Sequence, residues 1–210
     1  MLRDDLITLL GQRLGNRTDL DSRMQSELLM LQSVTLEETG AFTPWFLETE
    51  LATQDCTAGD ERLPLPTDFL AEMEEQSLWL YDVNTSPYML EMQKDSYDVM
   101  VQRFPVAGKP RRYAQTASYF LLKPTPDIVY TFKMRYYARD TALTTNLENK
   151  WLLHAPDLVL AELGAVMAKH IQNPTMEASF RADAQAARSR LYVKHEARAH
   201  NGRTYSMGED

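Results

Sequence analysis

The residue types that most often carry chemistry are sparse in this sequence. Cys56 is the single cysteine, and the four histidines are His154, His170, His195 and His200. None of the histidines shows a metal-like spacing to another histidine or to a carboxylate. Cysteine catalysis would require a base beside Cys56, and the sequence indicates none. Glycine-rich phosphate loops, HExxH and paired cysteines are also missing. We therefore expect no catalytic, cofactor-binding or metal site, and interpret these side chains as structural or solvent-exposed.

The placement of charge is more informative. The chain has a net charge of −8 and a pI of about 5.1, which argues against a dedicated nucleic-acid binder. Against this acidic background, residues 181–203 hold a basic set with only two acids among it. The basic set is Arg181, Arg188, Arg190, Lys194, Arg198 and Arg203. Arg190, Lys194 and Arg198 are spaced four residues apart, which predicts a basic stripe along one helix.

The basic set has two interpretations. It is either a solvated helix face or a docking surface for an acidic partner, which would be another protein or the acidic body of a neighbouring copy. Tyr192 and Tyr205 add aromatic side chains of the kind that protein interfaces favour. Contact with DNA ranks lower, because the rest of the chain would repel phosphate groups.

Length and composition indicate an ordinary globular protein. With 210 residues the chain makes one domain or two small ones and can bury a substantial core. The single cysteine excludes an intramolecular disulfide and fits a reducing compartment. The first residues are acidic and lack a long apolar core, so we expect no signal peptide. No apolar run reaches about 18 residues, so we expect no membrane span.

Apolar periodicity predicts helices at both ends of the chain. The predicted helices cover residues 1–14, about 18–39, about 155–171, and 174 to about 200. The third helix is apolar on most faces, which is typical of a buried helix. Its Ala161, Gly164, Ala165 and Ala168 lie on one side, where they would let another backbone approach closely.

The middle of the chain is predicted to be β-rich. The clearest strand covers residues 128–137, where Ile128, Tyr130, Phe132, Met134 and Tyr136 form one apolar row. Other expected elements are a strand at 45–51, an extended edge segment at 62–70 that contains two prolines, a strand from about 77, short strands near 87–92 and 112–114, and a helix from about 95 to 104.

The predicted fold class is α+β, a helical bundle built from the N- and C-terminal helices with an inserted antiparallel β-rich region. The helical core would comprise residues 1–40 and 145–200, and the β-rich insertion residues 41–144. Residues 201–210 are polar and are expected to form a flexible C-terminal tail.

Four pieces of the sequence carry a family resemblance. The first runs from Arg62 to Leu70 and includes Pro64, Pro66, Asp68 and Phe69, and the second is Gly108 and Pro110 with Tyr113-Ala114. The third consists of Leu121, Pro124, Pro126-Asp127, Tyr130, Tyr136-Tyr137 and Leu143. The fourth consists of Asn146, Asn149, Leu152-Leu153 and Ala155-Pro156-Asp157-Leu158. In this order and spacing they resemble the head-to-tail adaptor (connector) proteins of tailed bacteriophages, particularly the short-tailed type. The resemblance covers most of the chain from about residue 60 to 195, and residues 42–61 match no part of the pattern.

The resemblance implies a structural virion protein rather than an enzyme. Such adaptors form a ring, typically a dodecamer, beneath the portal; the ring extends the DNA channel and provides the tail or nozzle attachment surface. The implied partners are the portal protein, tail or nozzle proteins and further copies of the chain, with no cofactor and no membrane. DNA would pass through the channel without specific binding. The implied location is the virion neck, after assembly in the host bacterial cytoplasm.

In this family the helical part and the C-terminal tail commonly contact the portal. The basic set and Tyr205 are therefore the candidate interface with the portal or with a neighbouring copy. Two alternatives stay open. One is a different neck or tail-completion protein that does not contact the portal, and the other is a small intracellular enzyme or regulator with an unmarked site in the β-rich region.

Overall fold

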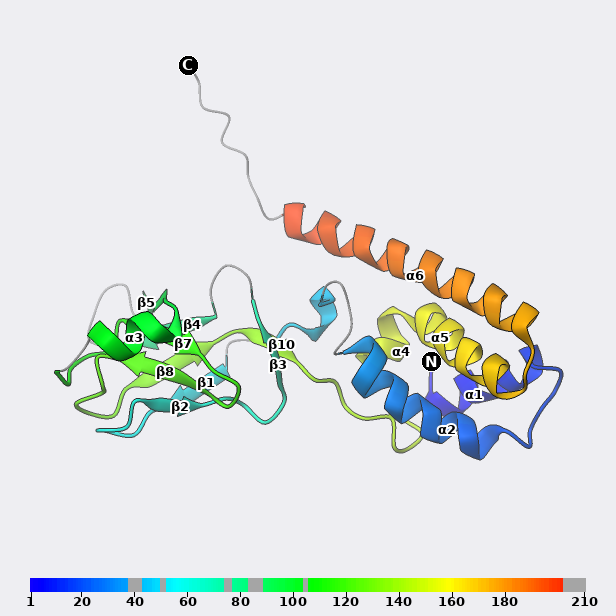
Figure 1. The fold of residues 1–210 in the computed structure, drawn as a ribbon, viewed down its shortest axis with the longest axis horizontal. Helices are drawn as coiled ribbons and strands as arrows, with labels where there is room; N and C mark the ends of the chain where they lie inside the picture. The colour runs from blue at the N-terminus through cyan, green and yellow to red at the C-terminus, as the bar shows by residue number, and fades with distance from the viewer. Residues whose placement is uncertain (38–42, 50–51, 74–76, 83–88, 104–105, 202–210) are drawn as a thin grey trace, which may run out of the picture. The chain divides into compact units, whose positions relative to one another are not determined.

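The structure is a computed structural model that describes residues 1–37, 43–49, 52–73, 77–82, 89–103 and 106–201. The chain divides into two compact units (Figure 1). The helical unit consists of Met1–Leu47 and Arg139–Asp210, and the β unit of Glu48–Ala138. Helices lie at both ends of the chain and an antiparallel-rich β region in the middle, so the predicted α+β class is confirmed.

The helical unit is formed by both ends of the chain. Its elements are α1 (Arg3–Arg13), α2 (Asp21–Met30), the π-helical turn η1 (Leu31–Leu36), the 3₁₀ turn η2 (Trp45–Leu47), α4 (Lys150–His154), α5 (Pro156–His170) and α6 (Pro174–Asn201). Gly15 and Asn16 follow α1 with φ of +88° and +60°, a conformation suited to a helix end. These bounds confirm the helices predicted at both ends, although the second begins at Asp21 rather than near residue 18.

The packing of α5 against α6 depends on a glycine on α5, which has no side chain. Phe180 on α6 is buried, and its ring lies against Gly164 on α5. A Cβ built on Gly164 would come within 2.6 Å of two ring carbons, a distance that real Cβ atoms do not reach. Ala184, Ala187 and Leu191 continue the buried face of α6. The small residues predicted to allow a close approach on α5 thus do so at Gly164, where an aromatic ring fills the space.

Residues 139–149 return the chain to the helical unit, where the buried side-chain amides of Gln32 and Asn149 form hydrogen bonds with their backbone. Gln32 on η1 is 4% exposed; its Nε2 donates to the carbonyl of Thr141 at 3.2 Å and its Oε1 accepts from the N–H of Leu143 at 3.3 Å. Asn149 caps α4, with Oδ1 accepting from the N–H of Leu152 at 3.0 Å. The Asn149 Nδ2 donates to the same Thr141 carbonyl at 3.1 Å. This segment therefore satisfies its backbone through side chains rather than through a helix or sheet.

The start of α1 binds the same segment. The Arg3 guanidinium donates to the carbonyl of Thr144 at 2.7 Å, and the N–H of Asp4 donates to Asn146 Oδ1 at 3.1 Å. Asn146 and Asn149, both part of the fourth sequence piece, thus have defined structural roles.

The described residues of the β unit form three sheets. Their strand orders are β1-β9-β4-β5, β10-β3 and β2-β8-β7-β6, and every pairing is antiparallel except that of β6 with β7. The strands are β1 (Ala52–Asp55), β2 (Arg62–Pro64), β3 (Phe69–Glu72), β4 (Leu78–Tyr81), β5 (Met89–Glu91), β6 (Gln93–Lys94), β7 (Arg112–Gln115), β8 (Tyr119–Lys123), β9 (Thr131–Met134) and β10 (Tyr136–Ala138); α3 is Tyr97–Arg103. The proline-containing β2 lies at a sheet edge, as predicted.

Aromatic side chains join these sheets. The ring of Phe69 on β3 stacks on Tyr136 at 5.5 Å and meets the edge of Phe120 at 5.9 Å. Tyr113 on β7 packs edge-on to Phe120 at 5.5 Å. The Tyr136 hydroxyl donates to Asp68 at 2.8 Å, and burial together with this carboxylate raises the pKa of Tyr136 to about 12. Three of the four sequence pieces therefore meet in one core.

Two predicted strands are wrong in detail. Trp45 and Phe46 lie in the 3₁₀ turn η2, and β1 begins only at Ala52; the alternation at 45–51 is too short to specify a strand where tertiary packing favours a turn. The predicted strand at 128–137 is divided into β9 and β10. Ile128 and Val129 precede β9 and are 58% and 59% exposed. Backbone hydrogen bonds to Tyr130 and Pro126, on either side of them, hold their loop outside the strand.

Gly164→Ala should lower the free energy of unfolding by roughly 1–3 kcal/mol, because the added methyl group overlaps the Phe180 ring. Urea unfolding measures the change. Combining it with Phe180→Leu, which shortens the side chain that the methyl group meets, should recover part of the loss. The matched control is Gly108→Ala, whose Cβ would lie 3.9 Å from Pro124, an ordinary contact. Equal urea midpoints for Gly164→Ala and Gly108→Ala would contradict this account of the packing.

Candidate interaction surface of the helical unit

The arginines of α6 are largely paired within the chain. Arg190 contacts Asp157 at 2.6 Å, and both side chains are more than half exposed. Arg188 contacts Glu162 on α5 at 2.7 Å, and Arg181 contacts Glu177 one turn earlier on α6 at 2.7 Å. An exposed pair such as Arg190–Asp157 contributes little to stability, about 0–1 kcal/mol, whereas Glu162 in the pair with Arg188 is only 16% exposed. The effect of the three pairs is to place a carboxylate beside each guanidinium.

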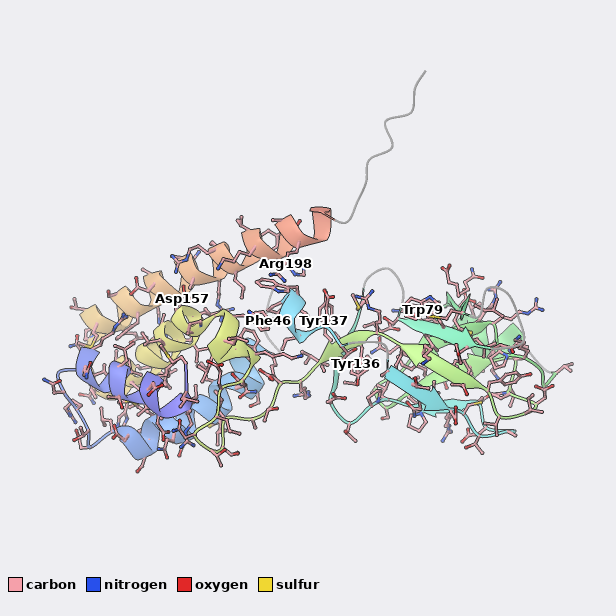
Figure 2. All side chains as sticks on the ribbon, turned by 180° about the vertical axis from the view of Figure 1, so that it is seen from behind. Phe46, Trp79, Tyr136, Tyr137, Asp157 and Arg198 are labelled. Carbon is pink, nitrogen blue, oxygen red and sulfur yellow. The ribbon has the colours of Figure 1, made fainter. Side chains whose placement is uncertain are left out.

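Arg198 has a different partner. Its guanidinium carbon lies 4.5 Å from the ring centroid of Trp45, which belongs to η2. The adjacent Phe46 is buried and stacks on His154 of α4, with ring centroids 5.1 Å apart and planes 24° from parallel. The ring of Phe46 also meets Trp151 edge-on at 5.1 Å. Phe46 and Arg198 are labelled in Figure 2. These five residues, termed the aromatic cluster, join η2 and α4 to the C-terminal part of α6.

His154 is exposed at the edge of the aromatic cluster, and its surroundings lower its pKa. Partial burial lowers the pKa of this imidazole, and the positive charges of Arg198, Lys150 and Lys194 lower it further. The negative charge of Asp140 acts in the opposite direction. The neutral imidazole is therefore the favoured form against Phe46.

Five of the predicted interface residues can be placed on α6 and two cannot. Arg181, Arg188, Arg190 and Arg198 have the partners described above, and Lys194 is exposed. Arg203 and Tyr205 lie outside the described residues. The helix also presents apolar side chains, since Tyr192 is 48% and Val193 65% exposed. The surface is therefore mixed rather than uniformly basic.

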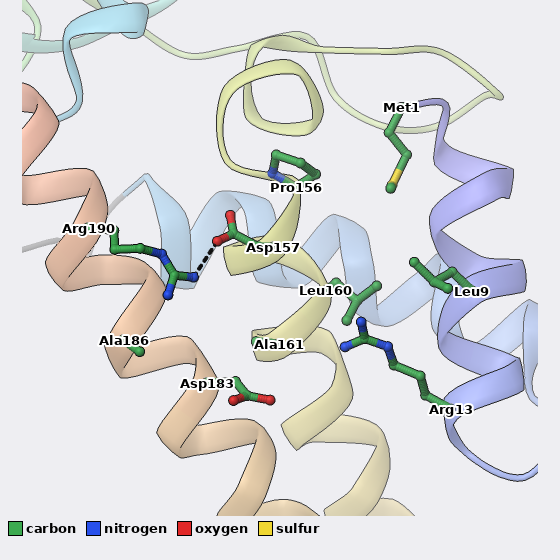
Figure 3. A pocket seen from close by; sticks show the side chains of 10 residues that line it. All are labelled: Met1, Leu9, Arg13, Pro156, Asp157, Leu160, Ala161, Asp183, Ala186 and Arg190. Atoms are coloured by element: carbon green, nitrogen blue, oxygen red, sulfur yellow. Dashed lines mark hydrogen bonds and ion pairs between the residues drawn. The ribbon is translucent and has the colours of Figure 1, made fainter.

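A groove lies over α5 between α1 and α6 (Figure 3). Its volume is about 360 Å³, and Leu160 and Ala161 of α5 form its apolar floor. Arg13 from α1 points across the floor, and Asp183 and Arg190 come from α6 (Figure 3). No sequence pattern predicts this groove, because its walls come from opposite ends of the chain, α1 (Arg3–Arg13) and α6 (Pro174–Asn201), with no motif in common.

Two further features concern metal binding and thiol reactivity. Among the described residues, no group of three or more His, Cys, Asp or Glu side chains could hold a metal ion. Burial raises the pKa of Cys56, which lies 4% exposed and whose Sγ accepts from the N–H of Tyr130 at 3.3 Å. A thiol held in this way is a poor nucleophile. In the part of the chain that the structure describes, no helix combines the length and apolarity needed to cross a bilayer.

His154 should make the stability of the helical unit dependent on pH. The unfolded chain takes up a proton on this imidazole near pH 6.5, whereas the folded unit resists it because its pKa is lowered. The stabilisation is therefore fully present above that pH and is lost as the pH falls below it. His154→Phe keeps an aromatic ring on Phe46 and should flatten this part of the dependence, measured as urea midpoints near pH 7.5 and about pH 5.5.

The control for this measurement is His170→Gln, which removes an exposed histidine at the end of α5, away from the aromatic cluster. It should keep the wild-type difference between the two pH values. A His154→Phe protein that loses as much stability on acidification as the wild type would show that this imidazole is not responsible.

Comparison with known families identifies the chain. A family model described as SU10 adaptor protein matches residues 1–207, which include both units. No curated protein gives a significant match. The match extends through residues 42–61, for which the sequence pattern gave no counterpart. The chain therefore belongs to the SU10 adaptor protein family, a family of phage head-to-tail adaptors.

Proposed function

We propose that this protein assembles as a ring beneath the portal of a tailed bacteriophage, extends the DNA channel and presents the attachment surface for the tail or nozzle. The observation that supports this is the family match over residues 1–207, because it covers nearly the whole chain rather than one common motif. A phage adaptor is a component of the virion neck, and its role there is structural rather than enzymatic. The ring is proposed to be a dodecamer.

The docking surface is assigned to α6 and the residues after it. Lys194 is exposed and Arg198 lies at the edge of the aromatic cluster, so both can meet an acidic surface of the portal or of a neighbouring copy. Arg181, Arg188 and Arg190 would contribute by exchanging their internal carboxylate partners for those of the other protein. Arg203 and Tyr205 complete the proposed interface.

The acidic character of the chain fits a channel component. With a net charge of −8, the protein would repel the phosphate backbone on average rather than retain it. DNA is therefore proposed to pass through the ring without specific binding. Tail or nozzle proteins are proposed to bind the β unit.

Coexpression with the portal protein of the same genome, followed by electron microscopy of the co-purified particles, tests the assembly. The expected particle is a portal with a second ring stacked on it that contains this chain, and averaging gives the copy number. Portal rings that leave this protein behind as a monomer would contradict the proposal and would favour a tail-side role without portal contact.

The charges of α6 are tested in the same particles. Lys194→Glu with Arg198→Glu should reduce co-purification with the portal at least ten-fold, because two favourable charges become repulsive toward an acidic partner. Circular dichroism should show an unchanged helical content, since Lys194 is exposed and loss of the Arg198–Trp45 contact costs only about 0.5–1 kcal/mol.

The matched control for this double variant is Lys169→Glu with Arg111→Glu. It changes the net charge equally, at exposed positions on α5 and in the β unit. Co-purification should stay near the wild-type level. If both double variants lose the portal to the same extent, the effect is one of total charge and the assignment to α6 is wrong.

A further inference from the structure

The β unit exposes two adjacent aliphatic side chains just before β9. Ile128 begins the apolar row that the sequence pattern would bury and Val129 begins the mixed row beside it, yet they are 58% and 59% exposed. Asp127 precedes them and is also exposed. We call these three residues the knob. Exposed aliphatic residues beside a charge, at a place where local patterning predicts burial, mark a candidate interaction site.

The knob is held in place by backbone contacts. Cys56 N–H donates to the carbonyl of Tyr130 at 2.9 Å, and Tyr130 N–H returns a bond to Cys56 Sγ at 3.3 Å. On the other side of the knob, Gly59 N–H donates to the carbonyl of Pro126 at 2.8 Å. The Tyr130 hydroxyl binds the Asp127 carboxylate at 2.7 Å. A loop fixed in this way loses little conformational entropy when it binds.

The groove of the helical unit has matching properties. Its volume of about 360 Å³ lies near the lower end of the range of about 300–1,000 Å³ found for ligand sites, which suits a pair of aliphatic side chains. Leu160 and Ala161 give it an apolar floor, and Ala186 contributes only a small side chain to the α6 wall. Arg13 points across this floor from α1 (Figure 3).

We propose that the knob of one copy inserts into the groove of the next copy in the ring. Ile128 and Val129 would cover the apolar floor, and the Asp127 carboxylate would meet the Arg13 guanidinium. The orientation follows from the charges of the walls: Arg190 is paired with Asp157, and Asp183 on the α6 wall would repel a carboxylate, so Asp127 is directed to the α1 side.

The occupant is a second copy because both halves of the contact are present in every chain. Knob and groove are different surfaces, so the contact is heterologous, and repetition of a heterologous contact produces a closed ring or an open filament. Asp55 and Asp60 are exposed near the knob and accept hydrogen bonds from Thr131 and from the backbone of Arg62. They add negative charge near the knob, which favours approach to a basic groove residue such as Arg13. This inference rests on the proposed ring and names the contact that closes it.

Disulfide trapping tests the contact directly. One full-length protein carries Val129→Cys and a second carries Ala186→Cys, both at exposed positions. When the two are mixed, assembled with the portal and oxidised, the expected product is a crosslinked dimer. A protein carrying both substitutions should give a ladder of higher multimers. The matched control pairs Val129→Cys with Val193→Cys, which is 65% exposed on the same helix but outside the groove, and should give no dimer.

Charge exchange provides a second test that does not depend on oxidation. Arg13→Glu and Asp127→Arg should each weaken self-association at least ten-fold, measured by sedimentation of the concentrated protein and by ring counts on the portal. The two variants mixed together should recover in alternating rings, because the wild-type knob of one then meets the wild-type groove of the other and the two mutant surfaces also join opposite charges. The double variant in a single chain should recover, because each contact again joins opposite charges.

The outcomes separate this inference from the proposed function. Suppose that the wild-type protein forms rings on the portal, but the Val129→Cys and Ala186→Cys proteins do not crosslink and the charge-exchanged double variant does not recover. That result overturns the knob-and-groove contact and leaves the adaptor role intact. A crosslink found only within single chains, seen as a faster-migrating monomer without multimers, also overturns it. Failure of the wild-type protein to join the portal contradicts the proposed function, while crosslinked multimers in the concentrated protein alone would still support the contact.

Discussion

The close approach of α5 and α6 at Gly164 and Phe180 is the constraint on which the helical unit depends. Because the Phe180 ring occupies the place that a Cβ on Gly164 would take, α6 packs this ring directly on the α5 backbone. That position brings Arg188 and Arg190 within ion-pair distance of α5 carboxylates and makes Ala186 a wall of the groove. It also directs the far end of α6 to Trp45. A wider separation would remove these contacts together.

The inserted β unit depends on a second constraint, at the point where the chain returns. Gln32 and Asn149 satisfy the backbone of residues 139–149, which has neither a helix nor a strand to do so. Inside the β unit, Tyr136 stacks on Phe69 of its own sheet and binds Asp68, and Phe69 meets Phe120 of a second sheet. Each unit thus has its own core and its own polar anchor, which is consistent with a protein that presents different surfaces to different partners.

Regular patterns in the sequence were sufficient for the fold class and for much of the element order. The apolar stripe through Phe180 and Leu191 identifies α6, and the two prolines near residue 64 identify an edge strand. Periodicity failed at Ile128, because the loop before β9 is fixed by Cys56 and Gly59, which are about 70 residues away in the chain. It also failed at Trp45, whose 3₁₀ turn is favoured by packing on α4.

The interaction surface was less accessible to sequence reasoning than the fold. The stripe through Arg190 and Arg198 was visible as spacing, but the identity of each partner was not, since Asp157 and Trp45 come from other segments. The groove has the same origin in separate segments. Contacts between distant residues are set by the packing of helices, and no local pattern encodes them.

The internal pairing of the α6 arginines bears on how a newly made subunit behaves before it meets its partners. A guanidinium beside a carboxylate of its own chain has little net attraction for a polyanion, so nucleic acid in the surrounding solution would gain few contacts from Arg181, Arg188 and Arg190. The Arg190–Asp157 pair is exposed and weak, so a closely fitting acidic surface can replace this internal carboxylate at small cost, whereas the Arg188–Glu162 pair is partly buried. In the proposed function, this internal pairing would keep the subunit from binding phage DNA before it assembles.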